Sequence, residues 1–526
     1  MNTILWKDKA LELKDGINLI SRFWYPKEGD CWPVLFMRQP YGREIASTIT
    51  YSHPTWWADK GFLVVIQDVR GQGGSGGSFN GFSQEPGDTK ESINWLRSLP
   101  ECNGKVGLYG FSYQGITQLL VEEGCDPPDC LSPAMTGLNN KDFWCSDGNA
   151  FWWQINISWG LQLACMKLKR QKRFKEWVNI RKTLEDESYL REGLDLLKEY
   201  DPNNIILKWL EYSNKEIKLK NIEPLKSWLK KPILLIGGLW DPHLRGTIDI
   251  YKKSILAGGE PEIYIGPSSH LNWAEETNDI LLDFFEKHLK RNKSNKAKFF
   301  PKRKIWNITT NKWEKINNLS NKNEYWSLSS SINRNSSSLI STGILRKDKP
   351  GKGLITIVSD PWRPVPSIGG HLSYKDSGIC NRINIDKRND IAKFDSTKNS
   401  ENHSIQGIPE LMIKASADKL TFDICIALSI INPTNSKVLQ ISTGFLRVKN
   451  QNILEEKMLN IKLQPINFIL KKDWIMRLSI AGTSWPAIGV NSGKLNIEAG
   501  PPSGEHEIIT INLILNESNF FVSPIF

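Results

Sequence analysis

The chain has 526 residues, 40% of them hydrophobic, and a formal net charge of +11. It is too long for one core, so we expect two or three domains. No apolar run reaches the roughly eighteen residues of a membrane-spanning helix. The lysines are interleaved with acids, as on solvated helices, and no finger or basic recognition helix occurs, which argues against nucleic-acid binding.

The eight cysteines are scattered, with no Cys-x-x-Cys pair and no metal-ligand spacing. Free thiols in a reducing compartment are therefore expected. Residues 1–16 lack the charged and then apolar pattern of a secretion signal. We expect a cytoplasmic protein without metal or cofactor, and the chain allows a homo-oligomer.

Residues 1–135 predict the first part of an α/β sheet. Asp15-Gly16 fits a hairpin turn, and Phe62–Ile66 is typical of a parallel strand buried on both faces. The Gly-rich loop at 67–77 lacks the Gly-Lys-Ser/Thr ending of a phosphate loop. Further strands and a helix are predicted by alternation and helical spacing at Leu11–Leu13, Asn18–Tyr25, Pro33–Arg38 and Gly87–Leu99.

The pattern changes twice after residue 135. Residues 136–230 are rich in Lys and Glu and helical in period, for example at Phe174–Leu184 and Tyr189–Tyr200, which predicts a helical cap. Buried strands and a helix return over residues 231–298, the second part of the core. Residues 299–526 show short strands between Asn, Ser and Gly turns, which predicts a jelly-roll β-sandwich.

The segment Gly110-Phe111-Ser112-Tyr113-Gln114-Gly115 follows an apolar strand and precedes a helix-forming run, Ile116–Glu123. It is similar to a Gly-x-Ser-x-Gly frame with one extra residue before the second glycine. In such a strand–turn–helix segment the serine is exposed at the carboxyl edge of the sheet, within reach of a base. Ser112 is therefore a candidate nucleophile.

A serine nucleophile needs a base, and the base needs an orienting carboxylate. Asp241 and His270 each follow a predicted strand, in the chain order serine, acid, histidine of α/β-hydrolases. His243, two residues after Asp241, is the strongest rival base. The backbone N–H of Tyr113 and the phenol of Tyr41 are candidate donors to the oxyanion.

The chain resembles the cocaine esterase and X-prolyl dipeptidyl-peptidase family of serine hydrolases. The matching segments include Arg38-Gln39-Pro40-Tyr41, Asp68-Val69-Arg70-Gly71, Gly110–Gly115, Trp240-Asp241, Gly266-Pro267-Ser268-Ser269-His270, and Pro364-Val365-Pro366 with Gly369-Gly370. The resemblance implies an α/β-hydrolase domain with a helical cap and a C-terminal jelly roll. It also implies Ser112, His270 and Asp241 as the triad, with Tyr41 and Tyr113 at the oxyanion hole.

The resemblance leaves the substrate open among esters, amides and X-Pro peptides. Pro242-His243-Leu244 follows the expected acid without a carboxylate to pair with an α-ammonium group, although Asp147 is an alternative anchor. We therefore favour an esterase or acylase for uncharged aromatic or apolar acyl groups. An X-Pro dipeptidyl aminopeptidase and a catalytically inert carbohydrate- or ligand-binding protein are the alternatives. Candidate pocket residues, which ordinary core packing also explains, are Trp152, Trp153, Trp240 and Trp273.

Overall fold

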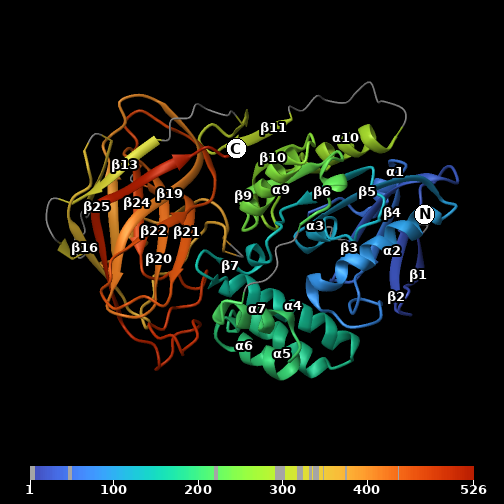
Figure 1. Cartoon of the computed structure of the whole chain (residues 1–526), viewed down its shortest axis with the longest axis horizontal. Helices are drawn as coiled ribbons and strands as arrows, with labels where there is room; N and C mark the ends of the chain where they lie inside the picture. The colour runs from blue at the N-terminus through green and yellow to red at the C-terminus, as the bar shows by residue number, and fades with distance from the viewer. Residues whose placement is uncertain are drawn as a thin grey trace. The chain divides into compact units, whose positions relative to one another are not determined.

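A computed structural model of the chain describes residues 6–45, 50–217, 223–290, 302–316, 324–330, 334–335, 343–347, 349–373, 376–435 and 437–526. The chain, coloured by residue number in Figure 1, divides into two compact units. The first unit comprises Met1–Phe143, Met166–Arg173 and Leu219–Ile305. The second comprises Trp144–Cys165, Phe174–Lys218 and Trp306–Phe526.

The first unit is built on one largely parallel sheet. Its first six strands lie in the order β1 (Trp6–Glu12), β2 (Asn18–Trp24), β4 (Leu63–Asp68), β3 (Trp32–Gln39), β5 (Cys102–Phe111) and β6 (Cys130–Ala134). The sheet continues beyond β6, because Leu131 N–H donates to Pro232 O at 3.0 Å and Met135 N–H to Ile236 O at 2.8 Å. The strands that follow are β9 (Leu234–Trp240), β10 (Glu262–Ser269) and β11 (Arg303–Asn307), of which Arg303–Ile305 belong to this unit.

Helices cover both faces of this sheet. Trp57 of α1 (Pro54–Asp59) and Phe285 of α10 (Thr277–Leu289) contact each other and Tyr109 of β5, so these two helices share a face. Arg38 of β3 is on the opposite face, where it contacts α2 (Glu85–Ser98). The remaining helices of this unit are α3 (Tyr113–Thr117), α8 (Lys226–Leu229) and α9 (Leu244–Leu256).

The helix after Ser112 is shorter than the sequence predicts. Its expected span was Ile116–Glu123, but α3 ends at Thr117. The Gln118 side chain donates to Gly110 O and Ser132 O and accepts from Ser132 N–H, so it bonds to the backbone of β5 and β6. These tertiary contacts outweigh the helical propensity of the residues that follow.

Helices make up most of the segment between β6 and β9. They are α4 (Trp153–Arg170), α5 (Phe174–Glu185), α6 (Tyr189–Tyr200) and α7 (Ile205–Asn214), after the two-residue strands β7 (Cys145–Ser146) and β8 (Ala150–Phe151). The predicted helices Phe174–Leu184 and Tyr189–Tyr200 are confirmed as α5 and α6. Their buried residues recur at helical spacing, for example Tyr189, Gly193, Leu196 and Leu197.

The rest of the second unit is an all-β structure whose large sheet curls on itself. Its longest strands are β19 (His403–Ala417), β20 (Phe422–Asn432), β21 (Lys437–Val448), β24 (Ile475–Ala481) and β25 (Ile509–Ser523). Shorter strands are β13 (Glu324–Ser329), β14 (Arg334–Asn335), β15 (Gly343–Arg346), β16 (Leu354–Ser359), β17 (Cys380–Asn381), β18 (Ile391–Ser396), β22 (Lys457–Lys462) and β23 (Ile466–Leu470), with a single helical turn, α11 (Ile383–Asp386). The strand β12 (Lys312–Lys315) is not part of this sheet and lies next to β11 in the sheet order. The predicted change from an α/β to an all-β pattern is therefore observed.

A buried ion pair ties two neighbouring strands of this unit. Asp423 of β20 and Arg447 of β21 are cross-strand partners. The Arg447 guanidinium donates to both carboxylate oxygens, at 2.8 and 2.7 Å, and to Gly489 O at 2.7 Å. Asp423 Oδ1 also accepts from Asn491 Nδ2 at 2.9 Å, so the pair is bonded to its surroundings within the β-structure.

Within the described residues, no helix is long and apolar enough to cross a membrane. The predicted domain boundaries after residues 135, 230 and 298 stay predictions. The last of them falls at residues outside the described ranges.

Candidate active site

Ser112 lies at the sharp turn between β5 and α3. Its φ of 57° and ψ of −124° are sparsely populated for a residue with a side chain. The turn is held by backbone bonds on both sides: Ser112 N–H donates to Ala134 O at 3.1 Å and Met135 O at 3.2 Å, at the end of β6. Ser112 O accepts from Gly115 N–H at 2.9 Å and from Thr136 Oγ1 at 3.0 Å.

Two glycines make this turn sterically feasible. A Cβ on Gly110, whose φ is +140°, would lie 2.5 Å from the Cβ of Gln114. A Cβ on Gly115 would lie 2.9 Å from Ala134 O. Both distances are shorter than atoms of this kind allow, so the frame around Ser112 requires glycine at each position.

Asp241 and His270 follow the neighbouring parallel strands β9 and β10. Asp241 is fully buried, and its Oδ1 is 2.6 Å from Nδ1 of His270. The His270 side chain keeps 26% of its surface exposed. Its ring centroid is 5.3 Å from that of Phe111, the residue before Ser112. Strand ends far apart in the sequence thus bring a buried carboxylate, an imidazole and the serine turn together.

His243 contacts the same carboxylate through its backbone. Its N–H donates to Asp241 Oδ2 at 3.1 Å, and its ring Nδ1 is 2.9 Å from Asp142 O. The ring packs edge-on against His270 at 5.1 Å. Burial lowers the pKa of His243 to about 4. Of the two histidines, His270 has the ring-to-carboxylate contact that orients a catalytic base.

The Tyr113 backbone N–H begins α3 directly after Ser112. The Tyr113 side chain is buried, and its hydroxyl donates to Glu85 Oε1 at 2.7 Å. Phe82 stacks on the Tyr113 ring with centroids 5.2 Å apart. The backbone N–H, and not the phenol, is therefore the group of Tyr113 that fits the expected oxyanion role.

Tyr41 lies in the loop that follows β3. Gln39, at the end of that strand, accepts from Gln114 Nε2 at 3.0 Å and donates to Gly42 O at 3.0 Å. The loop with Tyr41 is thus bonded to α3, which begins at Tyr113. The Tyr41 phenol is near enough to Tyr113 to contribute to the raised pKa of the Tyr113 phenol, after burial and Glu85.

Two of the four candidate pocket tryptophans lie in the first unit. Trp273 donates from its indole nitrogen to His270 O at 3.2 Å, and its ring contacts Phe111 at 5.5 Å and Tyr51 at 5.2 Å. Trp240 precedes Asp241 and is half-buried. Within the described part of the chain, its buried indole nitrogen has no hydrogen-bond partner. Both therefore adjoin the acid and base positions.

Trp152 and Trp153 belong to the second unit, where both are buried. The Trp152 indole donates to Ser146 Oγ at 2.8 Å, and the Trp153 indole donates to Leu190 O at 2.8 Å. Both side chains take part in packing within that unit. A pocket role for either one stays a prediction.

Sequence reasoning missed a row of aromatic rings in the first unit. Phe143 contacts Phe82 at 5.0 Å and His243 at 4.9 Å. Rings therefore follow one another from Tyr113 through Phe82, Phe143 and His243 to His270. Both phenylalanines lie in short 3-10 turns, Gly81–Gln84 and Asn140–Phe143, where no periodic pattern indicates a role.

Sequence reasoning also missed a buried ion pair near the Ser112 turn. It is formed by Arg38 and Glu85. An acid in the first turn of a helix is ordinarily read as favourable for the helix dipole. Arg38 was noted only as part of a resembling segment. Neither residue type signals by itself that it belongs to a buried ion pair next to the serine turn.

Comparison with known proteins identifies the family of the chain. The model described as X-Pro dipeptidyl-peptidase (S15 family) matches residues 15–272. The model described as X-Pro dipeptidyl-peptidase C-terminal non-catalytic domain matches residues 295–518. Cocaine esterase from Rhodococcus sp. (strain MB1 Bresler) is 20% identical over 482 residues, which cover 84% of this chain and 83% of that protein.

Solved structures share the fold over almost the whole chain. An α-amino acid ester hydrolase aligns with a TM-score of 0.69 at 17% identity, covering 99% of this chain and 96% of its own. An aminopeptidase from the marine sediment archaeon Thaumarchaeota archaeon aligns with a TM-score of 0.71 at 15% identity, covering 99% and 97%. A CocE/NonD family hydrolase from Staphylococcus aureus aligns with a TM-score of 0.71 at 16% identity, covering 99% and 93%.

These findings confirm the predicted fold class, an α/β-hydrolase domain with a helical insertion and a C-terminal all-β domain. They also confirm the prediction of an enzyme over that of an inert binding protein. The chain belongs to the X-Pro dipeptidyl-peptidase and cocaine esterase family of serine hydrolases, which act on esters or X-Pro peptides.

Proposed function

We propose that Ser112, His270 and Asp241 are the nucleophile, base and orienting acid of a hydrolase that cleaves a carboxylic ester or amide through an acyl-enzyme. The observation that carries the proposal is the 2.6 Å contact between His270 Nδ1 and the fully buried Asp241. A buried carboxylate in this position holds the imidazole in one orientation and stabilises it when it takes up a proton.

The proposed reaction has two halves. His270 Nε2 takes the proton of the Ser112 hydroxyl as Oγ bonds to the substrate carbonyl carbon. The Tyr113 N–H and the Tyr41 phenol donate to the carbonyl oxygen, which becomes negative in the tetrahedral intermediate. The protonated His270 then gives its proton to the departing alcohol or amine. Water repeats these steps on the acyl-enzyme and releases the acid.

We favour an uncharged aromatic or apolar acyl group as substrate. Support comes from the rings beside the base, Phe111, Trp273 and Tyr51. The residues directly after Asp241 offer no carboxylate, whereas a buried α-ammonium group needs a paired charge. A small ester or amide is therefore the expected partner of the site.

The second candidate is an X-Pro dipeptidyl aminopeptidase, which the descriptions of both matching family models favour. Such an enzyme needs an acidic anchor for the free amine of its substrate. Asp147 is the anchor that the sequence suggests, and it belongs to the second unit. The two candidates therefore differ in whether a free α-amine raises or lowers the rate.

We also place the enzyme in the cytoplasm. The support is that none of the eight cysteines, all of which lie in the described residues, forms a disulfide. Unpaired thiols are typical of a reducing compartment.

Labelling with a fluorophosphonate probe, followed by intact mass measurement, tests the nucleophile. Wild-type protein should gain one probe adduct, and the Ser112→Ala variant should gain none. The matched control is Ser98→Ala, which removes an exposed hydroxyl at the end of α2 and should label like wild type. Equal labelling of Ser112→Ala and wild type would assign another nucleophile.

Comparing phenyl esters with Ala-Pro anilides separates the two candidate functions. Turnover of the esters alone supports the favoured substrate class. Faster cleavage of the anilide, lost when its amine is acetylated, would support the dipeptidyl aminopeptidase instead.

A further inference from the structure

The residue after Ser112 must be held by something other than its own helix. The helix α3 has only five residues, and a helix of this length is not stable by itself in water. Ser112 occupies a strained conformation that persists only where its surroundings fix it. The position of the Tyr113 N–H therefore depends on contacts that α3 makes with other elements.

Glu85 supplies such a contact. It is the first residue of α2 and is fully buried. Its Oε1 accepts a hydrogen bond of 2.7 Å from the hydroxyl of Tyr113, which is 2% exposed. Because the Tyr113 ring also stacks on Phe82, its orientation is set at both the hydroxyl and the ring face. The Tyr113 side chain is thus fixed, and the backbone N–H of the same residue is the candidate oxyanion donor.

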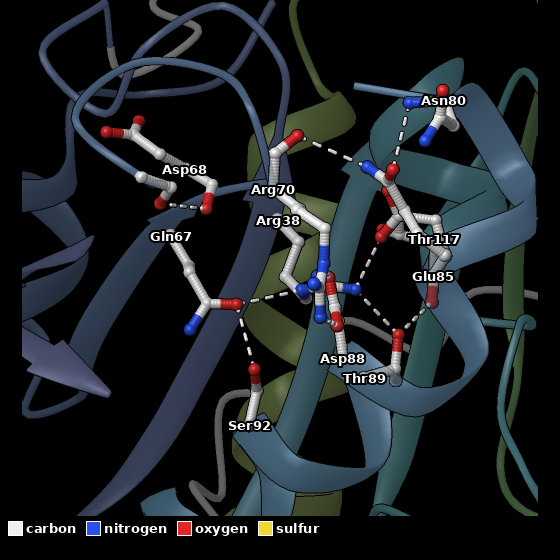
Figure 2. A network of polar contacts seen from close by, with 12 residues as sticks. Arg38, Gln67, Asp68, Arg70, Asn80, Glu85, Asp88, Thr89, Ser92 and Thr117 are labelled. Carbon is white, nitrogen blue, oxygen red and sulfur yellow. Dashed lines mark hydrogen bonds and ion pairs between the residues drawn. The ribbon is translucent and has the colours of Figure 1, made fainter. Parts of the chain in front are cut away.

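Arg38 holds Glu85 in turn, as Figure 2 shows. Its Nη1 donates to Glu85 Oε2 at 2.6 Å and to Thr89 Oγ1 at 2.7 Å, and its Nε donates to Gln67 Oε1 at 2.8 Å. Gln67 also accepts from Ser92 Oγ at 2.9 Å. Arg38 is 3% exposed, so it connects β3, β4 and α2 inside the protein.

The same set of bonds reaches the other end of α3. The Thr89 hydroxyl, which accepts from Arg38, donates to Thr117 O at 3.4 Å. Glu85 and Thr89 lie one turn apart on α2, and they bond to the first and last residues of α3. The N-terminal turn of α2 therefore clamps α3 at both ends.

Arg38 also lies on the strand that leads to the second candidate donor. β3 ends at Gln39, and Tyr41 follows two residues later. The carboxylate that fixes Tyr113 is thus paired with a guanidinium on the strand that precedes Tyr41. One buried ion pair connects the supports of both candidate oxyanion donors.

Charge favours this arrangement. Burial raises the pKa of Glu85, and the neighbouring Arg38 opposes that rise. Burial and Glu85 raise the pKa of the Tyr113 phenol, so the phenol stays protonated and donates. A buried ion pair adds little stability compared with apolar residues of the same volume. Stability alone therefore does not explain why a buried ion pair lies next to the serine turn.

We propose that Glu85, held by Arg38, is a positioning residue of the oxyanion hole, which fixes the Tyr113 N–H through the Tyr113 phenol. The inference rests on the proposed function of Ser112 and Tyr113. It adds that a residue without contact to the substrate sets how well the tetrahedral intermediate is stabilised.

Tyr113→Phe is the variant that tests this inference, because it removes one oxygen and keeps the ring and the backbone N–H. With para-nitrophenyl benzoate, kcat/KM should fall about tenfold to a hundredfold, since small misplacements in a site cost factors of this size. The matched control is Tyr109→Phe, the same change at a buried tyrosine of β5, which should keep wild-type kcat/KM.

Two inhibitors separate positioning from general damage. The boron of phenylboronic acid bonds to Ser112 Oγ, and the serine proton passes to His270. The boron is then tetrahedral and negatively charged, like the tetrahedral intermediate. The affinity for phenylboronic acid should fall in Tyr113→Phe by the same factor as kcat/KM. The affinity for benzyl alcohol, a neutral competitor, should stay unchanged. An equal fall for both inhibitors, or no fall for either, overturns the inference.

Glu85→Gln extends the test. It keeps the shape of the side chain but removes the charge that pairs with Arg38, and it should lower kcat/KM in the same direction. The double variant should lose no more than the larger single loss, because both changes act through one contact. Additive losses contradict the inference. If Glu85→Gln does not fold, Tyr113→Phe alone decides.

The outcomes also separate this inference from the function on which it rests. If wild type takes up the fluorophosphonate and Ser112→Ala does not, the function stands, and an unchanged rate in Tyr113→Phe refutes only the positioning role. If wild type takes up no probe, the function fails, and the inference fails with it.

Discussion

Each unit of the molecule contains a buried arginine–carboxylate pair, and the two pairs are connected differently. Arg447 and Asp423 in the second unit face each other across neighbouring strands and share both carboxylate oxygens. Arg38 and Glu85 in the first unit share only one carboxylate oxygen. The other oxygen of Glu85 accepts from Tyr113, the residue after Ser112.

This difference teaches how to distinguish a structural pair from one that supports a site. Burial does not distinguish them, since Arg38 is 3% and Arg447 is 5% exposed. What differs is the third residue that each carboxylate contacts. Asp423 accepts from Asn491 of the same all-β part at 2.9 Å, whereas Glu85 accepts from Tyr113, the residue after Ser112. We call Arg447–Asp423 the closed pair, because its side-chain contacts stay within the all-β part. We call Arg38–Glu85 the open pair, because it reaches the residue after Ser112.

The largest expected effect comes from changing the triad residues, which carry out the chemistry that the open pair supports. His270→Ala and Asp241→Asn should each lower kcat by about 10⁴, because both remove the oriented base. Asp423→Asn, which alters the closed pair, should keep kcat within about twofold at a temperature where the protein is folded. Steady-state kinetics with a phenyl ester measures all three. His243→Ala should cost less than His270→Ala, and the reverse order would reassign the base.

The arginines themselves give the sharpest comparison. Arg38→Met and Arg447→Met each leave a buried carboxylate unpaired and should cost about 3–5 kcal/mol of stability. Urea unfolding should show similar losses. Only Arg38→Met should also lower kcat/KM in the folded protein. If Arg447→Met lowers kcat/KM as much as Arg38→Met does, the distinction between open and closed pairs is wrong.

Tyr41→Phe tests a candidate oxyanion donor directly, whereas Arg38→Met tests a residue that supports one. Removal of one oxyanion donor costs about 10²–10³ in rate, so kcat should fall by this factor. The half-buried phenol contributes little to the core, and thermal unfolding should stay near that of wild type. A rate equal to wild type would remove Tyr41 from the oxyanion hole.

The smallest expected effect is a pH dependence in the first unit. The pKa of His243 is about 4 in the folded chain, against 6.5 for an unperturbed histidine, because the ring is buried. As pH falls, the unfolded chain takes up this proton first. The stability from a neutral His243 is therefore complete above pH 6.5 and is lost as pH falls toward 4, a change on the order of 3 kcal/mol.

Urea unfolding of wild type and His243→Asn between pH 7 and pH 4.5 measures this loss. Asparagine can still donate to Asp142 O but does not titrate, so the variant should lose less stability on acidification. Parallel curves for the two proteins would show that His243 does not contribute.

Much of the fold was predictable from local patterns. The helix Tyr189–Tyr200 was predicted with the ends it has, because its apolar residues recur at helical spacing. The strand ends that carry Ser112, Asp241 and His270 were likewise recognised from apolar runs followed by polar loops. Their mutual arrangement follows from the parallel sheet, which brings carboxyl ends to one edge.

The buried support of the site was not predictable in this way. Arg38 and Glu85 are far apart in sequence, and their pairing depends on how α2 crosses the sheet. The premature end of α3 has the same cause, since the Gln118 side chain bonds to backbone groups of other elements. Contacts made by single polar side chains across the fold leave no periodic pattern in a sequence.

The two glycines around Ser112 have a genetic consequence. Every glycine codon begins with two guanines, and any third base is silent. A change in either of the first two bases of the codons for Gly110 or Gly115 therefore adds a Cβ, or stops translation. That Cβ would meet Gln114 or the Ala134 carbonyl at 2.5 or 2.9 Å. Neutral variation at these two codons is confined to the third base.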